Sequence, residues 1–396
     1  MKNLALLGIS TPFMASLLSS CSKYDFHKDL EVNFNGKVLV IGAGSAGLIA
    51  GHILKKYNID FQIIEASPVF GGRVKKIEGF ADFPIDLGGE WIHTDPSVLA
   101  RLLNDPESEG KIDIVRYSPE EVYIWKNNQL RRRNFFSNFY GEYKFKSSTW
   151  YDFFDQHIVP GIQSNIIFNA PVKEIDYSSD RVVVKTENND TYEADKVLVT
   201  VPLKILQNNF ISFQPALPQD KTNALNEVRM PDGIKVFMEF SEKFYPDIVL
   251  DGGIGEIMDE ASGDKAFYDI AFRKDTSHNV LALFAVGDAA SVYTNMAREE
   301  DIVNRALSEL DMMFNGKASE TFIKHVIQNW SKEPFIKGSY SHYDNETSYK
   351  DVIQTLKEPV DNKVFFAGEA YYADDYATVH GAGESAYAAM ERILKD

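Results

Sequence analysis

Three glycines near the N-terminus have the spacing that binds a diphosphate group. Gly42, Gly44 and Gly47 form the pattern GxGxxG, with Ser45 and Ala46 between the second and third glycines. Gly42 permits a tight turn, Gly44 lets the backbone approach the diphosphate, and Gly47 lets a helix pack closely against a strand. The backbone amides at the start of that helix can then hold the anion.

An acidic residue follows where a ribose would lie. The strand-like run Val38–Ile41 precedes the glycines, a helical stretch follows them to Lys56, and the run Phe61–Glu65 ends on a carboxylate. Glu65 can accept hydrogen bonds from a ribose diol and would repel a 2′-phosphate. The segment therefore predicts a βαβ unit that binds an adenine dinucleotide, with a glycine-rich turn without ligand as the alternative. This pattern does not separate NAD from FAD.

Two further glycine pairs extend the pattern. The run Gly71–Arg73 lies just past the second strand, where backbone amides and a guanidinium could contact the rest of a longer cofactor. The run Asp86–His93, with the sequence DLGGEWIH, adds a glycine pair before an aromatic residue. This string, after a GxGxxG unit and a GGR triplet, resembles the flavin-containing amine oxidase family, which includes monoamine oxidases, polyamine oxidases and the lysine-specific histone demethylase.

The C-terminal part of the chain resembles the same family. The strand Val364–Ala367 runs into a Gly-Glu pair, and the run Tyr376–Gly383 opens the last helix, as in the C-terminal flavin motif of the family. A helix N-terminus aimed at the flavin would stabilise the negative charge of reduction by about 1 kcal/mol. The resemblance implies FAD bound by Gly42, Gly44, Ser45, Ala46, Gly47, Glu65, Gly72, Arg73, Gly88, Gly89, Glu90, Trp91, Val172, Trp330, Gly368, Glu369, Thr378 and Val379.

The resemblance also assigns a role to Lys235. Alternation along Ile234–Phe240 places Lys235 on the face opposite Ile234 and Val236, and this pattern alone favours a lysine that faces solvent. The corresponding family strand carries a lysine that bonds through a water to flavin N5. For Val172, the family implies a backbone contact with the adenine, and a position in the strand core is the alternative.

The substrate side is predicted from two more segments. Trp330 and the run Gly338–Ser341 resemble the segment that lines the flavin in the family, and Tyr340 matches one wall of its aromatic cage. The opposite wall aligns with Thr378, which leaves half a cage. Ser339 lies where monoamine oxidases carry a flavin-linking cysteine, so FAD is expected to be held without a covalent bond.

Strand-like and helical runs alternate along the chain and predict an α/β fold. We expect a Rossmann-like FAD-binding domain of discontinuous segments, 36–95, 166–215 and 355–396, and a second α+β substrate domain from 96–165 and 216–354. The resemblance is weak between Asp95 and Ile166, where Tyr123–Leu130 reads as a hairpin. The triplet Arg131–Arg133 is interpreted as a solvated turn rather than an anion site.

The N-terminus has the profile of an export signal. A short basic start is followed by an apolar stretch to Leu18 and by Leu18–Cys21, which resembles a bacterial lipobox. We expect a signal peptide over 1–21, a lipid anchor at Cys21, a polar tether over 22–35, and a location in the bacterial cell envelope. A cytoplasmic protein with an incidental cysteine is the alternative.

Composition excludes several other classes of protein. The 396 residues are 44% hydrophobic, enough for a sizeable core, and the net charge of −17 argues against a nucleic-acid partner. The same charge suits a cationic ligand or simply a soluble protein. A single cysteine excludes an intrachain disulfide, a cysteine-rich zinc site and an iron–sulfur cluster.

The resemblance implies oxidation of an amine by hydride transfer to FAD, with O2 as acceptor and an imine and hydrogen peroxide as products. An FAD enzyme with a substrate other than an amine, as in porphyrinogen oxidases or carotenoid desaturases, is the first alternative. A tethered flavin-binding protein without turnover is the second, and L-amino acid oxidation lacks a recognisable arginine for the substrate carboxylate. The sequence does not name the amine or the oligomeric state.

Overall fold

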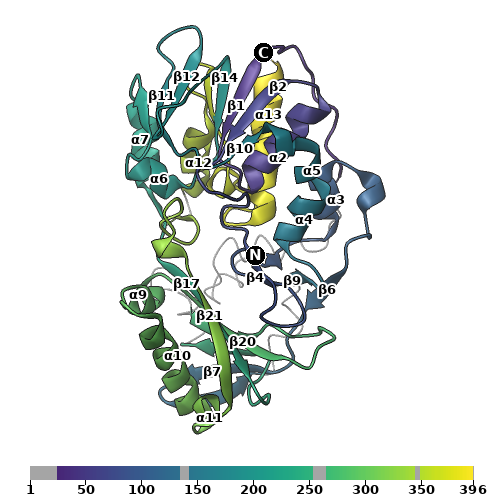
Figure 1. Ribbon diagram of the computed structural model, residues 1–396, viewed down its shortest axis with the longest axis vertical. Coiled ribbons are helices and arrows are strands. Elements are labelled where there is room, and N and C mark those ends of the chain that lie inside the picture. Colours follow the sequence, from purple (N-terminus) through teal and green to yellow (C-terminus); the bar gives the residue numbers. More distant parts are fainter. Residues whose placement is uncertain (1–24, 134–141, 253–264, 344–347, 396) are drawn as a thin grey trace.

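The computed structural model describes residues 25–133, 142–252, 265–343 and 348–395. Figure 1 shows two sheets at opposite ends of the molecule, each with its own helices. We call them the parallel-sheet domain and the mixed-sheet domain, after the pairing of their strands. The α/β, two-domain architecture predicted from the sequence is confirmed.

Five parallel strands form the centre of the parallel-sheet domain, in the order β10-β2-β1-β14-β23. Alternate residues of β1 pack into different cores: Val38 and Val40 into one, Leu39 and Ile41 into the other. The sheet is therefore buried on both faces, as parallel sheets require. The strands are β1 (Lys37–Ile41), β2 (Asp60–Ile64), β10 (Ile166–Ile167), β14 (Lys196–Val199) and β23 (Val364–Phe366).

Helices cover one face of this sheet and a second sheet with shorter helices covers the other. The first layer contains α2 (Ser45–Lys56), α3 (Ser97–Leu103), α4 (Trp150–His157), α5 (Val159–Ile162) and α13 (Val379–Lys395). The second layer contains β11 (Val172–Asp176), β12 (Val182–Thr186), β13 (Thr191–Ala194), β15 (Ser212–Gln214), α6 (Leu203–Gln207), α7 (Gln219–Asn226) and α12 (Tyr349–Lys357).

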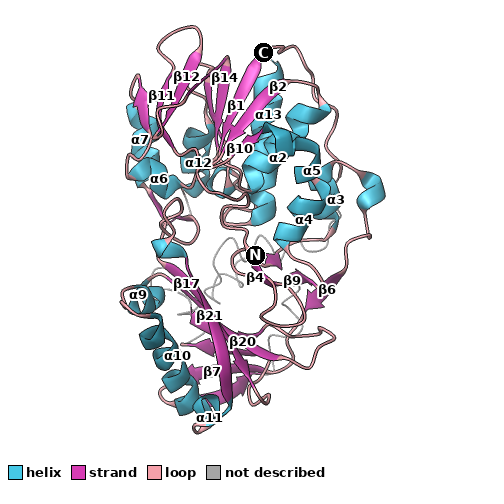
Figure 2. Ribbon diagram, viewed as in Figure 1, coloured by secondary structure: helices cyan, strands magenta, loops and turns pink. Residues whose placement is uncertain are grey.

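Seven strands form the mixed-sheet domain, in the order β21-β17-β20-β19-β18-β7-β8. Only the β18–β7 pair is parallel among them. Figure 2 shows α9, α10 and α11 along one side of this sheet. The elements are β7 (Val122–Lys126), β8 (Gln129–Arg133), β17 (Gly233–Phe240), β18 (Ile248–Asp251), β19 (Lys265–Asp269), β20 (Asn279–Val286), β21 (Phe322–Asn329), α9 (Asp288–Thr294), α10 (Glu299–Phe314) and α11 (Lys317–Thr321).

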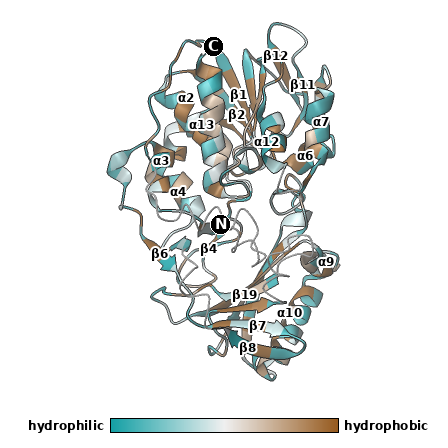
Figure 3. Cartoon of the chain, turned by 180° about the vertical axis from the view of Figure 1, so that it is seen from behind, coloured by the Kyte–Doolittle hydropathy of each residue, from teal (hydrophilic) through white to brown (hydrophobic). Residues whose placement is uncertain are grey.

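Both faces of the seven-stranded sheet are covered. The helix α10 packs apolar residues such as Ile302 and Leu310 on one face, and Figure 3 shows both hydrophobic and hydrophilic residues along it. On the opposite face, Phe80, Ile85 and Leu87 pack against Phe237 of β17. Lys235 lies on the same face of β17 as Phe237. The segment that contains Phe80, Ile85 and Leu87 therefore covers the face that carries Lys235.

Short elements join the two domains. A three-stranded sheet has the order β5-β9-β6, and its strands are β5 (Trp91–Ile92), β9 (Glu142–Phe145) and β6 (Ile114–Tyr117). The remaining pairs are β3 (Lys76–Ile77) with β4 (Ile85–Asp86), and β16 (Val228–Arg229) with β22 (His342–Tyr343). Four 3-10 turns complete the described chain: Pro106–Ser108, Gln163–Asn165, Trp330–Lys332 and Glu369–Tyr371.

The predicted strands Val38–Ile41, Phe61–Glu65, Ile234–Phe240 and Val364–Ala367 are present as β1, β2, β17 and β23, and the last helix begins at Val379, within the predicted run Tyr376–Gly383. The predicted hairpin is also present, as β7 and β8. The interpretation of Arg131–Arg133 as a turn is wrong, because the turn falls at Asn127 and Asn128 and the three arginines belong to β8. The described arginine side chains, those of Arg131 and Arg132, are exposed.

The predicted domain limits differ from the packing. Helices α3, α4 and α5 were assigned to the substrate domain, but their apolar residues pack into the core of the parallel-sheet domain, with α2 and α13. The described part of the predicted tether, 25–35, is also bound to that domain. The backbone N–H of Asn33 donates to Leu394 O at 2.8 Å, and His27 stacks on Tyr387 with ring centroids 3.6 Å apart. The polar composition of this segment predicted a tether without contacts to the domain. Backbone hydrogen bonds attach the segment to the end of α13 instead.

The predicted signal peptide and Cys21 lie outside the described residues. Among the residues that the structure describes, no helix is long and apolar enough to span a bilayer.

Candidate active site

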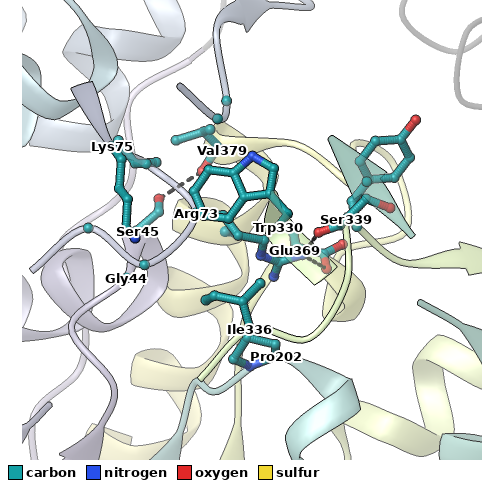
Figure 4. Close-up of a pocket in the computed structure, with 18 of the residues that line it drawn as sticks. Gly44, Ser45, Arg73, Lys75, Pro202, Trp330, Ile336, Ser339, Glu369 and Val379 are labelled. Atoms are coloured by element: carbon teal, nitrogen blue, oxygen red, sulfur yellow. Dashed lines mark hydrogen bonds and ion pairs between the residues drawn. The ribbon is translucent and has the colours of Figure 1, made fainter. Parts of the chain in front are cut away.

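A cavity of about 750 Å³ lies between the two domains and is lined by residues of both. Of the residues predicted to bind FAD or substrate, every one except Gly47 lines it. The cavity therefore brings together segments from four distant parts of the chain. Figure 4 shows part of its wall, with Trp330, Arg73 and Glu369 close to Ser339.

One end of the cavity is built from backbone without side chains, and we call it the glycine region: Gly42, Gly44, Gly47, Gly71 and Gly72. Gly42 has a φ of +105°, which a side chain disfavours. A Cβ on Gly47 would lie 1.9 Å from Gly42 O, so only glycine allows this contact of helix and turn. The N–H of Gly71 donates to Ala43 O at 2.8 Å, which closes the second turn onto the first. The roles predicted for Gly42 and Gly47 agree with this geometry.

Glu65 lies beside the glycine region and is 7% exposed. Its carboxylate accepts hydrogen bonds from the N–H of Ala43 at 2.6 Å and of Ser67 at 2.8 Å. Burial raises the pKa of Glu65, and these N–H donors oppose the rise. A carboxylate has about four acceptor positions, so acceptor capacity is left for a ribose diol. The backbone cradle and this carboxylate fit the diphosphate and ribose of FAD.

The start of α13 closes another wall of the cavity. Thr378 Oγ1 accepts a hydrogen bond from the N–H of Gly381 at 2.9 Å and donates to Asp375 O at 2.7 Å, so it caps the helix. Ser45 Oγ donates to Val379 O at 2.8 Å. A Cβ on Gly89 would lie 2.4 Å from Val379 Cγ2, which brings the second glycine pair against this helix.

Arg73 and Glu369 form an ion pair on the cavity wall. Arg73 Nη1 donates to Glu369 Oε1 at 2.8 Å and to Ser339 O at 2.9 Å. The Ser341 hydroxyl donates to the second carboxylate oxygen of Glu369. The two residues predicted from separate motifs therefore hold each other, and the pair ties Ser339 into the wall.

The other end of the cavity carries a buried set of charges that we call the charged cluster: Glu90, Lys144, Lys235 and Tyr268. Lys235 is 2% exposed, and its Nζ donates to Gly88 O at 2.8 Å and to Glu90 Oε2 at 2.9 Å. The Tyr268 hydroxyl donates to Glu90 Oε2 at 2.6 Å, and Lys144 Nζ forms an ion pair with Glu90 Oε1. Burial opposes ionisation of Glu90, but the two ammonium groups outweigh it and lower the pKa of Glu90 to about 2.

Alternation alone predicts that Lys235 faces solvent. In the structure the Lys235 side chain is buried instead. The strand β17 lies between β20 and β21 and is buried on both faces. The family resemblance assigned Lys235 a role beside the flavin, and the residue lines the cavity in an ion pair with Glu90 that no motif predicted. Lys144 and Tyr268 were missed altogether, because each follows an ordinary strand pattern with no motif around it.

Aromatic rings flank the charged cluster. The Nζ of Lys235 lies 5.2 Å from the ring centroid of Trp91. Trp330 is 5% exposed, and its Nε1 donates to Leu87 O at 3.2 Å. Tyr340 is half-buried and lines the same cavity. At the other end, Val172 is 8% exposed and lines the cavity.

A second acid–base pair in the cavity wall was also missed. His93 Nδ1 lies 2.7 Å from Glu142 Oε1. Burial lowers the pKa of His93, but Glu142 and Asp375 outweigh it and raise the pKa above its ordinary value. No pattern indicated this pair, since Glu142 belongs to the stretch where the resemblance is weak.

The fold and the cavity define a class of protein. A parallel sheet with a dinucleotide cradle faces a mixed sheet that contributes a buried lysine and aromatic walls, which is the arrangement of a flavin-dependent amine oxidase.

The sequence matches the family described as Flavin containing amine oxidoreductase over residues 45–144 and 156–394, and the chain belongs to this family. The cofactor is accordingly a flavin, and the dinucleotide cradle identifies it as FAD.

Individual relatives agree with this assignment. The chain is 24% identical to "Probable polyamine oxidase 4" of Arabidopsis thaliana, over 88% of this chain and 85% of that protein. It is 26% identical to human "Lysine-specific histone demethylase 2", over 88% of this chain and 52% of the other. Among solved structures, cyclohexylamine oxidase from Brevibacterium oxydans IH-35A has the same fold, with a TM-score of 0.74 and 15% identity over 91% of this chain and 99% of that chain.

Proposed function

We propose that this enzyme oxidises an amine to an imine, with O2 as the final electron acceptor. The reacting C–H lies on the carbon beside a neutral nitrogen, water hydrolyses the imine, and O2 is reduced to hydrogen peroxide. When bound, FAD supplies the acceptor for the hydride. The observation that carries the proposal is the position of Lys235, buried in the same cavity as the glycine region.

The residues of this chain have separable roles in that reaction. The glycine region and Glu65 would hold the diphosphate and the ribose of FAD, and the start of α13 would lie against the flavin. The chain has one cysteine, Cys21, and Ser339 offers no thiol that could link the flavin, so we propose that FAD is held non-covalently.

The substrate would lie between apolar walls. Trp91, Trp330 and Tyr340 line the cavity and would exclude water from the reacting carbon. The Tyr340 ring would flank the amine on one side. On the other side Thr378 is too small to complete an aromatic cage, and its hydroxyl is engaged in capping α13. Lys235, with Gly88 O and Glu90 Oε2 as acceptors, would hold a water near the reacting groups by its remaining N–H.

The test is to purify the protein, record its visible spectrum and add a panel of amines without oxygen. We expect a flavin band that one or more amines bleach, and peroxide on readmission of oxygen. Acid precipitation should release the FAD into the supernatant. A flavin band that no amine bleaches would contradict the proposed substrate class and favour a substrate without an amine. Absence of peroxide with a bleaching amine would contradict O2 as the acceptor.

For the N-terminus, we propose export to the cell envelope with a lipid on Cys21. The support is the apolar stretch before the Leu18–Cys21 string. Cells that express the full chain should incorporate a radioactive fatty acid into it, and Cys21→Ala should abolish the label. Wild-type chain without label, or label on Cys21→Ala, would contradict the proposal.

A further inference from the structure

Glu90 is shared by two lysines, and only one of them lines the cavity. Lys235 is bound to Glu90 Oε2 and lines the cavity, whereas Lys144 is bound to Glu90 Oε1 and is absent from the lining. Lys144 is 4% exposed. Its Nζ lies 5.0 Å from the ring centroid of Tyr117 and 5.3 Å from those of Trp91 and Tyr268. Lys144 is thus a buried cation behind the carboxylate that holds Lys235.

Strand pairing determines this position. Lys144 of β9 lies opposite Trp91 of β5 in an antiparallel pair, and Glu90 immediately precedes Trp91. Lys235 comes from β17 in the mixed sheet. The two lysines therefore reach Glu90 from different sheets, and β5 brings Glu90 between them.

The charges of the cluster do not cancel. Ionised Glu90 contributes one negative charge, and the two ammonium groups contribute two positive charges. Burial and the charge of Glu90 raise the pKa of the neighbouring Asp86 well above its ordinary value. Burial, followed by the charge of Lys144, lowers the pKa of Lys274 to about 8, and nearby carboxylates oppose this change. Glu90, Lys144 and Lys235 together keep one positive charge in excess.

The excess positive charge changes the electrostatic potential in the cavity. With Glu90 alone as its partner, Lys235 would form a neutral pair and would present little net charge to a bound ligand. Lys144 offsets Glu90 from behind, so the charge of Lys235 is effective at the cavity. A hydride carries two electrons and one proton and brings one negative charge to the cofactor, and a nearby positive charge in a dry site stabilises it.

We propose that Lys144 is a positioning residue that holds Glu90 and preserves the positive charge of Lys235 toward the cavity, which raises the reduction potential of the bound flavin. The proposal rests on FAD binding in this cavity, and it does not depend on which substrate is oxidised.

A cycle of charge variants tests the proposal. Lys144→Met reduces the net charge of the three groups from one positive to zero, Glu90→Gln raises it to two, and the double variant restores one. We expect Lys144→Met to shift the two-electron reduction equilibrium about tenfold toward oxidised flavin, which is about 30 mV. Glu90→Gln should shift it about tenfold in the opposite direction, and the double variant should lie within about twofold of wild type. Potentials are measured on the purified holoenzyme by equilibration with reference dyes.

Matched variants separate charge from packing. Lys146→Met removes an exposed lysine beyond the end of the same strand, and Lys144→Arg keeps the buried charge, so both should leave the potential unchanged.

Equal potentials for Lys144→Met and Lys146→Met, or a double variant that does not return to the wild-type value, would overturn the proposal. If Lys144→Met does not retain FAD, Glu90→Gln is compared with the double variant instead. The double variant has one positive charge fewer, so the proposal requires its flavin to have the lower reduction potential. The dye titration uses no amine, so a failure of the proposed substrate class does not affect it.

Discussion

The glycine region and the charged cluster lie on one cavity and are built in opposite ways. The glycine region comes from two neighbouring stretches of chain and consists of backbone that disfavours a side chain at Gly42, Gly47, Gly71 and Gly72. The charged cluster comes from two sheets and consists of side chains in a nearly water-free environment. The comparison teaches that one region is sensitive to added atoms and the other to removed charge. The first is specified locally, and the second depends on how the sheets meet.

The largest effect is expected from removing the charge that faces the cavity. Lys235→Met should slow flavin reduction or flavin reoxidation at least about 100-fold, because the group that would hold the reacting water is gone. Anaerobic and aerobic stopped-flow absorbance measure the two steps separately. FAD should remain bound, and Lys146→Met is the control for loss of a lysine charge. Unchanged rates in both steps would remove the role assigned to Lys235.

An added methyl group should damage the glycine region next most strongly. Gly47→Ala places a Cβ 1.9 Å from a backbone oxygen that cannot move without opening the turn. Overpacking of this kind costs about 1–3 kcal/mol, or roughly 5–150-fold in affinity for FAD. Fluorescence titration of the apoprotein with FAD measures this affinity.

Gly161→Ala in α5 is the control for Gly47→Ala, since a Cβ there meets no atom within 4 Å. Equal affinity of the two variants for FAD would contradict the steric argument.

A smaller effect is expected at the start of α13, which Ser45 of the glycine turn contacts. Thr378→Ala removes the acceptor for the N–H of Gly381, which should lower the free energy of unfolding by about 1 kcal/mol. Urea denaturation followed by circular dichroism gives the value. Thr378→Ser keeps the hydroxyl and should lose less than half as much, and an equal loss in both variants would show that the methyl group matters instead.

The smallest effect concerns pH and the pair of His93 with Glu142. The pKa of His93 is raised in the folded protein. Protonation of His93 therefore stabilises the fold fully below its unfolded pKa of about 6.5, and this contribution is lost as pH rises through the folded pKa. Glu142→Gln should lower stability by less than about 1 kcal/mol near pH 6, because one third of the His93 side chain is exposed.

At pH 9, where His93 is neutral in both proteins, the difference between wild type and Glu142→Gln should shrink. Urea midpoints at the two pH values measure it. A difference that is constant between pH 6 and pH 9 would show that His93 protonation is not involved.

Much of the site could be predicted from the sequence because its motifs are local. Each glycine of the GxGxxG pattern acts on residues within one turn and one helix, and the predicted strands beside it are present. The opening of the last helix was likewise predicted from consecutive residues, the run Tyr376–Gly383. The helix begins at Val379, because the hydroxyl of Thr378 caps it.

The remaining parts depended on distant contacts. Alternation assigned the correct face to Lys235, but it could not tell that Phe80 and Leu87 cover the face it shares with Phe237. The helices of 97–103 and 150–162 have amphipathic patterns that suit either domain. Their place on the parallel-sheet domain is decided by the apolar surfaces of α2 and α13.

The sequence by itself determined the class of cofactor, because a strand, a glycine turn and a helix that hold a diphosphate are made by consecutive residues through backbone geometry. The tertiary structure alone decided the electrostatics of the substrate end. Glu90, Lys144 and Lys235 are far apart in the chain and meet only where β5 pairs with β9 beside β17. The interaction of charges depends on their separation and on their burial, and neither quantity exists until the sheets are packed.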